Sequence, residues 1–186
     1  RQGTAPLTCD DYGDNVQRAH FPGGSHTRRH NGVRDILVAM ARMAGLQAWP
    51  EPRTTLDMPL DTTANGVAIN PARITPDIRL LVPPAYSADN QFGGGGDFLI
   101  EVKTLQYGPT RYHRQQILDG TMSAVQLRQS DIPREYTRRL RQVDGTYATT
   151  APPGPTQRRF QDYKFVGMCQ GAWCELSGSI LSYLSL

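Results

Sequence analysis

The sequence predicts a single α/β domain, built on a mixed sheet of four or five strands with helices on both faces. Its length of 186 residues corresponds to one domain of ordinary size. Segments with helical periodicity alternate with short runs that have the composition of strands. Residues 1–27 lack periodicity and read as an irregular lead-in, so the predicted domain spans residues 28–186. No apolar run approaches the ~20 residues that cross a bilayer, so we expect no membrane partner.

The first helix is predicted over residues 28–44. Its apolar residues recur at helical spacing: Val33, Ile36, Leu37, Met40 and Ala44. Ser25 or Thr27 is the predicted N-cap, and Gly45 stands where a helix commonly ends. This segment has the clearest helical pattern in the chain.

The remaining elements are predicted in the order of three strands, a helix, a strand and an apolar closing helix. Their ranges are 46–49, 77–82 and 97–105 for the strands, 131–143 for the helix, 163–168 for the last strand and 173–186 for the closing helix. Ser130 or Asp131 is the predicted cap of the second helix. Residues 53–75 are expected to form turns and a weak hairpin, and the proline-rich residues 144–160 a loop.

The predicted strand from Asp97 to Leu105 carries the clearest chemical signal. Alternate residues of a strand share a face, so Glu101 and Lys103 lie together on one face. An ionised glutamate and lysine are costly to bury in the middle of a sheet. Two interpretations follow: the pair neutralises itself at the rim of the sheet, or both side chains point into a functional site and act there.

Asp77 favours the second interpretation, because it opens the preceding predicted strand directly after Pro76. If the two strands are neighbours, the carboxylates of Asp77 and Glu101 converge on one point. Two hard oxygen ligands form a site for Mg²⁺ or Mn²⁺, and such a cation polarises a phosphate oxygen and activates a bound water. Lys103 is then placed to orient that water or to offset charge in the transition state. The three residues predict metal-assisted phosphodiester cleavage.

The two segments resemble the motifs of the PD-(D/E)xK nuclease superfamily. Pro76-Asp77 and Glu101-Val102-Lys103 match its two motifs, with 23 residues between the acids. The predicted element order also resembles its restriction-endonuclease-like core, in the order αβββαβ. The resemblance implies a divalent-metal-dependent DNA endonuclease. It further implies that Asp77, Glu101 and the main-chain carbonyl of Val102 bind the metal.

A narrower resemblance covers most of the chain. The run from Arg28 to Asp35 leading into the first helix, together with Gly45 and Glu51-Pro52, looks like the endonuclease domain of some non-LTR retroelements. Residues 132–139 also suit related stand-alone domains. This resemblance implies a place in a mobile element.

A zinc site is not expected. Retroelement members usually carry a Cys/His knuckle upstream, where this sequence has only Cys9 and His20. Together with His26 and His30 these residues supply zinc-ligand types, but their spacing matches no familiar zinc pattern.

Three further residues are candidates for the site. Many family members place a carboxylate on or after the first helix, so Asp35 and Glu51 are possible additional acids for the metal cluster. The alternative for each is an ordinary surface charge. His30 opens the first helix, where it either ties down the turn or approaches the site.

Arginine dominates the cations of the chain, because only Lys103 and Lys164 among its 20 basic residues are lysines. The planar donor fork of arginine suits phosphate, although a GC-rich coding sequence would produce the same bias. Arginines on the two main helices are candidate nucleic-acid contacts, and a solvated polar face explains them equally well. The candidates are Arg28, Arg29, Arg34, Arg134, Arg138 and Arg139.

Three cysteines are an odd and small number, which argues against a disulfide framework. We therefore expect a reducing intracellular compartment, either nucleus or cytoplasm. The favoured partner is DNA, and the sequence leaves RNA and the oligomeric state open, a homodimer included. Two alternatives stand beside the endonuclease. One is a nuclease-fold module without catalysis that serves nucleic-acid binding or assembly, and the other is an unrelated α/β domain.

Overall fold

The computed structural model describes residues 25–53, 55–56, 74–86, 90–105, 124–146, 151–171 and 175–186. Its elements in chain order are α2 (Ser25–Met43), β1 (Gln47–Pro50), β2 (Ile78–Val82), β3 (Gly96–Thr104), α4 (Ala124–Val143), α5 (Pro155–Phe160), β4 (Lys164–Gln170) and α6 (Gly178–Leu184). Most of the predicted lead-in over residues 1–27, and most of the predicted hairpin over residues 53–75, lie outside the described residues.

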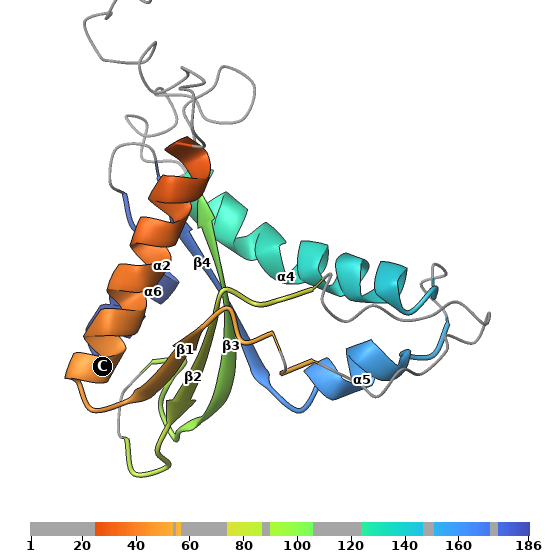
Figure 1. Ribbon diagram of the computed structural model, residues 1–186, viewed down its shortest axis with the longest axis horizontal. Helices are drawn as coiled ribbons and strands as arrows, with labels where there is room; N and C mark the ends of the chain where they lie inside the picture. The colour runs from red at the N-terminus through yellow and green to blue at the C-terminus, as the bar shows by residue number, and fades with distance from the viewer. Residues whose placement is uncertain are drawn as a thin grey trace, which may run out of the picture.

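The four strands form one open mixed sheet in the order β1-β2-β3-β4 (Figure 1). β1 pairs with β2 and β2 with β3 in antiparallel fashion, whereas β3 and β4 are parallel. Two strands that pair in parallel need a long crossover connection, and the connection between β3 and β4 contains α4 and α5. The prediction of an α/β domain with a mixed sheet is therefore confirmed, with four strands among the described residues.

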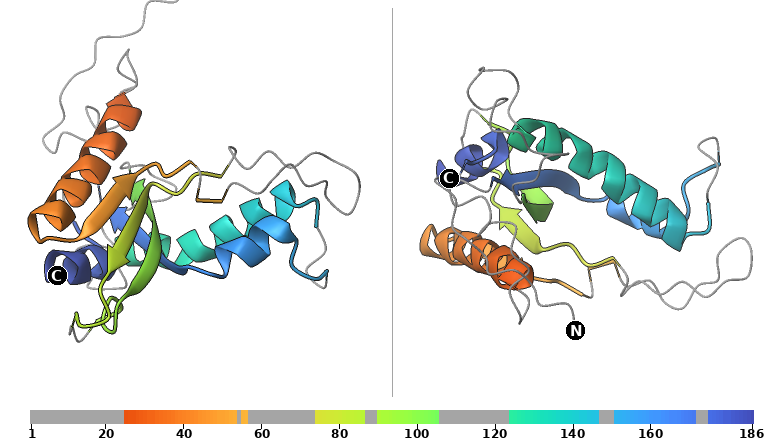
Figure 2. Two further views of the ribbon diagram at one scale, coloured as in Figure 1. Left: turned by 60° about the horizontal axis from the view of Figure 1, so that its bottom comes forward. Right: turned by 90° about the horizontal axis from the view of Figure 1, so that it is seen from above.

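Helices cover both faces of the sheet, with α2 on one side and α4 on the other (Figure 2, right). The core on the α2 face contains three alternate residues of β3, namely Phe98, Ile100 and Val102. They pack there with residues of α2 and α6. On the α4 face, Leu99 packs against Tyr136 and Leu140 of α4. Because side chains alternate along a strand, Glu101 belongs to the α4 face, like Leu99.

α2 confirms the most regular pattern of the sequence. It starts at Ser25, three residues before the predicted start at residue 28, and ends at Met43. Gly45 has a φ of +79°, and the next residue, Leu46, donates its N–H to the carbonyl of Ala41. This is the left-handed glycine stop that the sequence predicts.

α4 begins earlier than predicted, at Ala124 instead of residue 131, and continues through Pro133. The predicted cap at Ser130 or Asp131 is therefore wrong. The Ser130 hydroxyl donates to the carbonyl of Leu127 within the helix. The additional turns bury apolar residues against β4, and this burial outweighs the helix-start signal that proline gives.

α5 lies inside the segment 144–160, which the sequence predicts to be a loop, so that part of the prediction is wrong. Pro155 occupies its first turn. The carboxylate of Asp144, at the end of α4, accepts hydrogen bonds from the N–H groups of Thr156 and Gln157 at 3.0 and 2.9 Å. The helix is thus capped by a residue that lies before the proline-rich run, which a local pattern does not reveal.

The closing helix is shorter than predicted, since α6 spans Gly178–Leu184 instead of residues 173–186. Its Tyr183 hydroxyl donates to the carbonyl of Leu37 at 2.8 Å, which joins α6 to α2. Within the described part of the chain, every helix is too short or too polar to cross a bilayer.

Candidate active site

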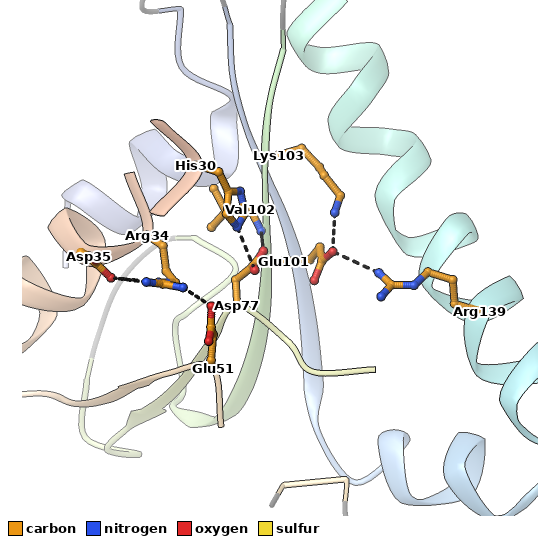
Figure 3. Close-up of polar contacts among 9 residues, drawn as sticks. All are labelled: His30, Arg34, Asp35, Glu51, Asp77, Glu101, Val102, Lys103 and Arg139. Carbon is orange, nitrogen blue, oxygen red and sulfur yellow. Dashed lines mark hydrogen bonds and ion pairs between the residues drawn. The ribbon is translucent and has the colours of Figure 1, made fainter. Parts of the chain in front are cut away.

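The register of β2 and β3 brings the two predicted acids to the same point of the sheet. Pairing between these strands ends at Ile78 and Ile100, so Asp77 and Glu101 are the next residues on each side. Burial raises the pKa of Glu101, and the negative charge of Asp77 adds to that shift. Figure 3 shows Asp77 on the side of β3 toward α2 and Glu101 on the side toward α4, so the convergence of their carboxylates on one point stays a prediction.

Both carboxylate oxygens of Asp77 are engaged. Oδ1 lies 3.0 Å from Nε2 of His30, which comes from the first half of α2, and Oδ2 accepts the N–H of Val102 at 2.7 Å. The hydrogen bond to Asp77 raises the pKa of His30 and favours the imidazolium. His30 therefore approaches the site, as one of its two predicted alternatives requires, and orients the Asp77 carboxylate.

Val102 presents its main chain to the Asp77 side of β3. In a β-strand, the N–H and C=O groups of one residue point to the same edge. Because the N–H of Val102 meets Asp77, its carbonyl is directed to the same edge, beyond the last β2–β3 pair. The Val102 side chain is buried in the core on the α2 face, which fixes this orientation.

Glu101 is a buried acid with only one of its two oxygens satisfied. The residue is 3% exposed. Its Oε1 contacts the ammonium of Lys103 and lies 3.3 Å from the guanidinium of Arg139, whereas Oε2 has no hydrogen-bond partner among the described residues. Burial raises the pKa of Glu101, and the two cations oppose that shift. The Glu101–Lys103 contact expected from the strand pattern is therefore present, with the glutamate buried.

α4 adds a residue that the sequence analysis does not single out. Tyr136 is buried, and its hydroxyl has no hydrogen-bond partner in the described part of the chain. Burial raises its pKa, and the charge of Glu101 adds to the shift. The Arg139 guanidinium lies 5.4 Å from the centroid of the Tyr136 ring. The only sequence signal was the spacing of Tyr136 and Arg139, three residues apart on one helix face.

The predicted additional acids Asp35 and Glu51 gather around Arg34 (Figure 3). The Arg34 guanidinium is buried, contacts the Glu51 carboxylate and donates to Asp35 at 2.9 Å. Glu51 nevertheless adjoins the site through its main chain, because its N–H donates to the carbonyl of Asp77 at 2.8 Å. Its φ of +42° is a left-handed value that is uncommon outside glycine.

The six candidate phosphate-binding arginines have different surroundings. Arg28, Arg134 and Arg138 are exposed to solvent, on α2 and α4. Arg29 donates to the carbonyl of Leu105 at the end of β3. Arg34 and Arg139 contact carboxylates, as described above.

The alternative zinc ligands Cys9 and His20, and the side chain of His26, lie outside the described residues. Among the residues that are described, no group of three or more histidine, cysteine, aspartate or glutamate side chains could hold a metal ion. The centre predicted from the sequence has only two acidic side chains and one main-chain carbonyl. Cys169 is a free, buried thiol, and burial raises its pKa to about 12.

The donors around Asp77 and Glu101 fit a hard divalent cation. Carboxylate and carbonyl oxygens are the ligands that Mg²⁺ and Mn²⁺ take in proteins. Oε2 of Glu101 has no hydrogen-bond partner in the part of the chain that the structure describes, and a bound cation would explain this, because buried polar atoms are normally satisfied. Comparisons with protein-family models, with curated proteins and with solved structures find no match for this chain.

Proposed function

We propose that the chain is a divalent-metal-dependent endonuclease that hydrolyses DNA phosphodiester bonds, built on a restriction-endonuclease-like core. The observation that carries the proposal is the buried Oε2 of Glu101, which has no hydrogen-bond partner among the described residues, at the end of the β2–β3 pairing where Asp77 also lies. A buried carboxylate oxygen without a partner destabilises the fold until a ligand binds to it. A place in a mobile element remains part of the proposal through the resemblance to non-LTR retroelement endonuclease domains.

Each residue of the site has a distinct part in the proposed reaction. Asp77, Glu101 and the main-chain carbonyl of Val102 would hold Mg²⁺ or Mn²⁺. When bound, such an ion polarises a phosphate oxygen and lowers the pKa of a water molecule. Lys103 contacts Glu101 and is partly open to solvent, so it is positioned to orient the attacking water. His30 keeps the Asp77 carboxylate in its orientation.

Arginines on the two helices that flank the sheet supply the proposed contacts to DNA. Arg134 and Arg138 on α4 and Arg28 on α2 are exposed, and arginine forks match phosphate oxygens. Arg139 stands closest to the reaction, since it already contacts Glu101. The guanidinium of Arg34 is buried between Asp35 and Glu51, which leaves it out of the proposed DNA surface.

Nicking of supercoiled plasmid tests the proposal. We expect Mg²⁺-dependent nicking by the parent protein. Glu101→Gln should slow nicking by more than about 100-fold. Substitution of a residue that only holds a metal ligand in place already costs about 10- to 100-fold, and Glu101 is itself a proposed ligand. Glu135→Gln is the matched control, the same substitution at a half-exposed acid of α4 that pairs with Arg128, and should nick within about twofold of the parent. Equal nicking by the parent and Glu101→Gln, or nicking that persists in EDTA, would contradict the proposal.

One observation favours a second function, a nuclease-fold module without catalysis that binds nucleic acid or serves assembly. Lys103 and Arg139 both contact Oε1 of Glu101, so these two side chains balance its charge without a metal ion. Calorimetric titration with Mn²⁺ separates the two functions. Saturable binding that is lost in Asp77→Asn and Glu101→Gln supports the endonuclease, whereas absence of binding to the parent protein supports the inactive module.

A further inference from the structure

The sheet face that carries Glu101 extends across β2 to the edge strand β1. In the register of the sheet, Trp49 lies opposite Arg79, and Arg79 lies opposite Leu99. Directly opposed residues share a face, so Trp49 and Arg79 are on the same face as Leu99 and Glu101. α4 packs against β4 on this face, and Trp49, on the edge strand, remains 40% exposed.

Four side chains on this face form an arginine–aromatic cluster, which comprises Trp49, Arg79, Tyr163 and Arg159. The Arg79 guanidinium carbon lies 5.5 Å from the ring centroid of Trp49 and 5.5 Å from that of Tyr163. Arg159 lies 6.0 Å from the Tyr163 centroid. The guanidinium of Arg79 is also held by two hydrogen bonds to the Asp97 carboxylate, at 3.0 and 2.6 Å. A fixed cation from the neighbouring strand thus lies over the Trp49 ring, while the residue remains 40% exposed.

The cluster is continuous with the candidate active site. Arg79 stands two residues from Asp77 along the chain, and Trp49 stands two residues from Glu51. Beyond the last β1–β2 pair, the Glu51 N–H still reaches the Asp77 carbonyl at 2.8 Å. Two residues of a strand span about 7 Å, which is about two nucleotide steps of 3.4 Å. Glu101 stands two residues from Leu99, the β3 neighbour of Arg79, so a nucleic-acid strand bound at Glu101 would reach the cluster within its next few nucleotides.

We propose that Trp49 is a stacking platform for an unpaired nucleobase of the substrate, close to the cleaved phosphate. The identity of the ligand as nucleic acid rests on the proposed function. Exposed aromatic rings beside arginines are the means by which proteins hold single strands, since every base offers a π-face and every nucleotide a phosphate. A base inside a duplex has both faces covered by its neighbours, so the platform selects a single-stranded or displaced nucleotide next to the site of cleavage.

Tryptophan fluorescence tests the platform directly, because the chain has two tryptophans, Trp49 and Trp173. The protein is titrated in EDTA with a twelve-residue oligothymidylate, and affinity is measured in parallel by anisotropy of the labelled strand. We expect saturable quenching by the single strand and none by a blunt duplex of the same length. Trp49→Phe should keep the affinity within about threefold and lose most of the quenching, since phenylalanine still stacks. Trp49→Ala should weaken binding by at least about fivefold, the lower limit for loss of one base–aromatic stack.

Met43→Ala is the control for loss of an exposed apolar side chain, since Met43 is highly exposed on α2, and it should change neither signal. Unchanged quenching in Trp49→Phe, or equal affinity of Trp49→Ala and the parent, would overturn the platform.

Because the titration contains no metal, its outcome is independent of catalysis. Quenching without Mg²⁺-dependent nicking supports the platform and removes the endonuclease, and nicking without quenching does the reverse. A dimer in size-exclusion chromatography that Trp49→Ala dissociates, with no quenching by oligonucleotide, would assign the face to a second copy of the chain and overturn the proposal.

Discussion

Two buried carboxylates of this domain are in opposite states. Asp144, at the junction of α4 and α5, is 1% exposed, and both of its oxygens accept main-chain N–H groups of the first turn of α5. Glu101, at the site on β3, is 3% exposed, with two cations on one oxygen and no hydrogen-bond partner among the described residues on the other. Burial alone therefore does not mark a functional acid. The unsatisfied oxygen distinguishes Glu101 from Asp144, because buried carboxylate oxygens are normally satisfied.

The physical roles of the two charges differ accordingly. The negative charge of Asp144 lies at the positive end of a helix, where it stabilises the fold. The charge of Glu101 is removed from water and is repelled by the negative charge of Asp77. Both effects disfavour the ionised form of Glu101. Removal of the Asp144 charge should therefore lower the free energy of unfolding, whereas removal of the Glu101 charge should raise it.

The largest effect on stability is expected at Asp144. Asp144→Ala removes both acceptors of the α5 N-terminus and should lower the free energy of unfolding by about 2 kcal/mol, the upper range for loss of a helix cap. Urea denaturation measures this loss, and nicking per folded molecule should stay within about twofold of the parent. A loss below about 0.5 kcal/mol would show that the cap contributes little and would remove the contrast with Glu101.

The second expected effect is a pH dependence at Glu101. The pKa of Glu101 is raised above its usual 4.5, chiefly by burial. Between 4.5 and the raised value the folded state binds more protons than the unfolded state, so the unfolding free energy of the parent should fall as pH rises through this window. Glu101→Gln lacks this titration and should gain stability relative to the parent over the same range, measured by urea denaturation between pH 4.5 and 8. The opposite slope would mean that the ion pairs with Lys103 and Arg139 outweigh burial.

The smallest effect is expected at Glu135, a third carboxylate that is paired but partly exposed. Arg128 donates to both of its oxygens, at 2.6 and 2.9 Å, and this hydrogen bonding lowers the pKa of Glu135. Its contribution is present above the usual pKa of 4.5 and is lost as pH falls through the lowered value. Because solvent screens the pair, Glu135→Gln should cost only about 0.5 kcal/mol at pH 7, measured by thermal or urea unfolding. A cost above about 2 kcal/mol would place Glu135 with Asp144 as a structural acid.

Local patterns were sufficient where an element depends on its own residues. The helical spacing from Val33 to Ala44 predicts α2, and Gly45 ends it as expected. The alternation from Asp97 to Leu105 predicts β3 and the shared face of Glu101 and Lys103. The patterns failed at α4 and α5, because the start of α4 is set by burial against β4 and the cap of α5 comes from Asp144.

The sequence by itself determined which acids and which lysine stand on neighbouring strands, since strand periodicity and chain order are local properties. Only the tertiary structure decided what surrounds them. Arg139 reaches Glu101 from 38 residues away and His30 reaches Asp77 from 47 residues away. The Trp49–Arg79–Tyr163 contacts depend on how β1, β2 and the residue just before β4 come together. Burial, unsatisfied oxygens and electrostatic coupling arise from packing between distant segments, and no spacing within one segment encodes them.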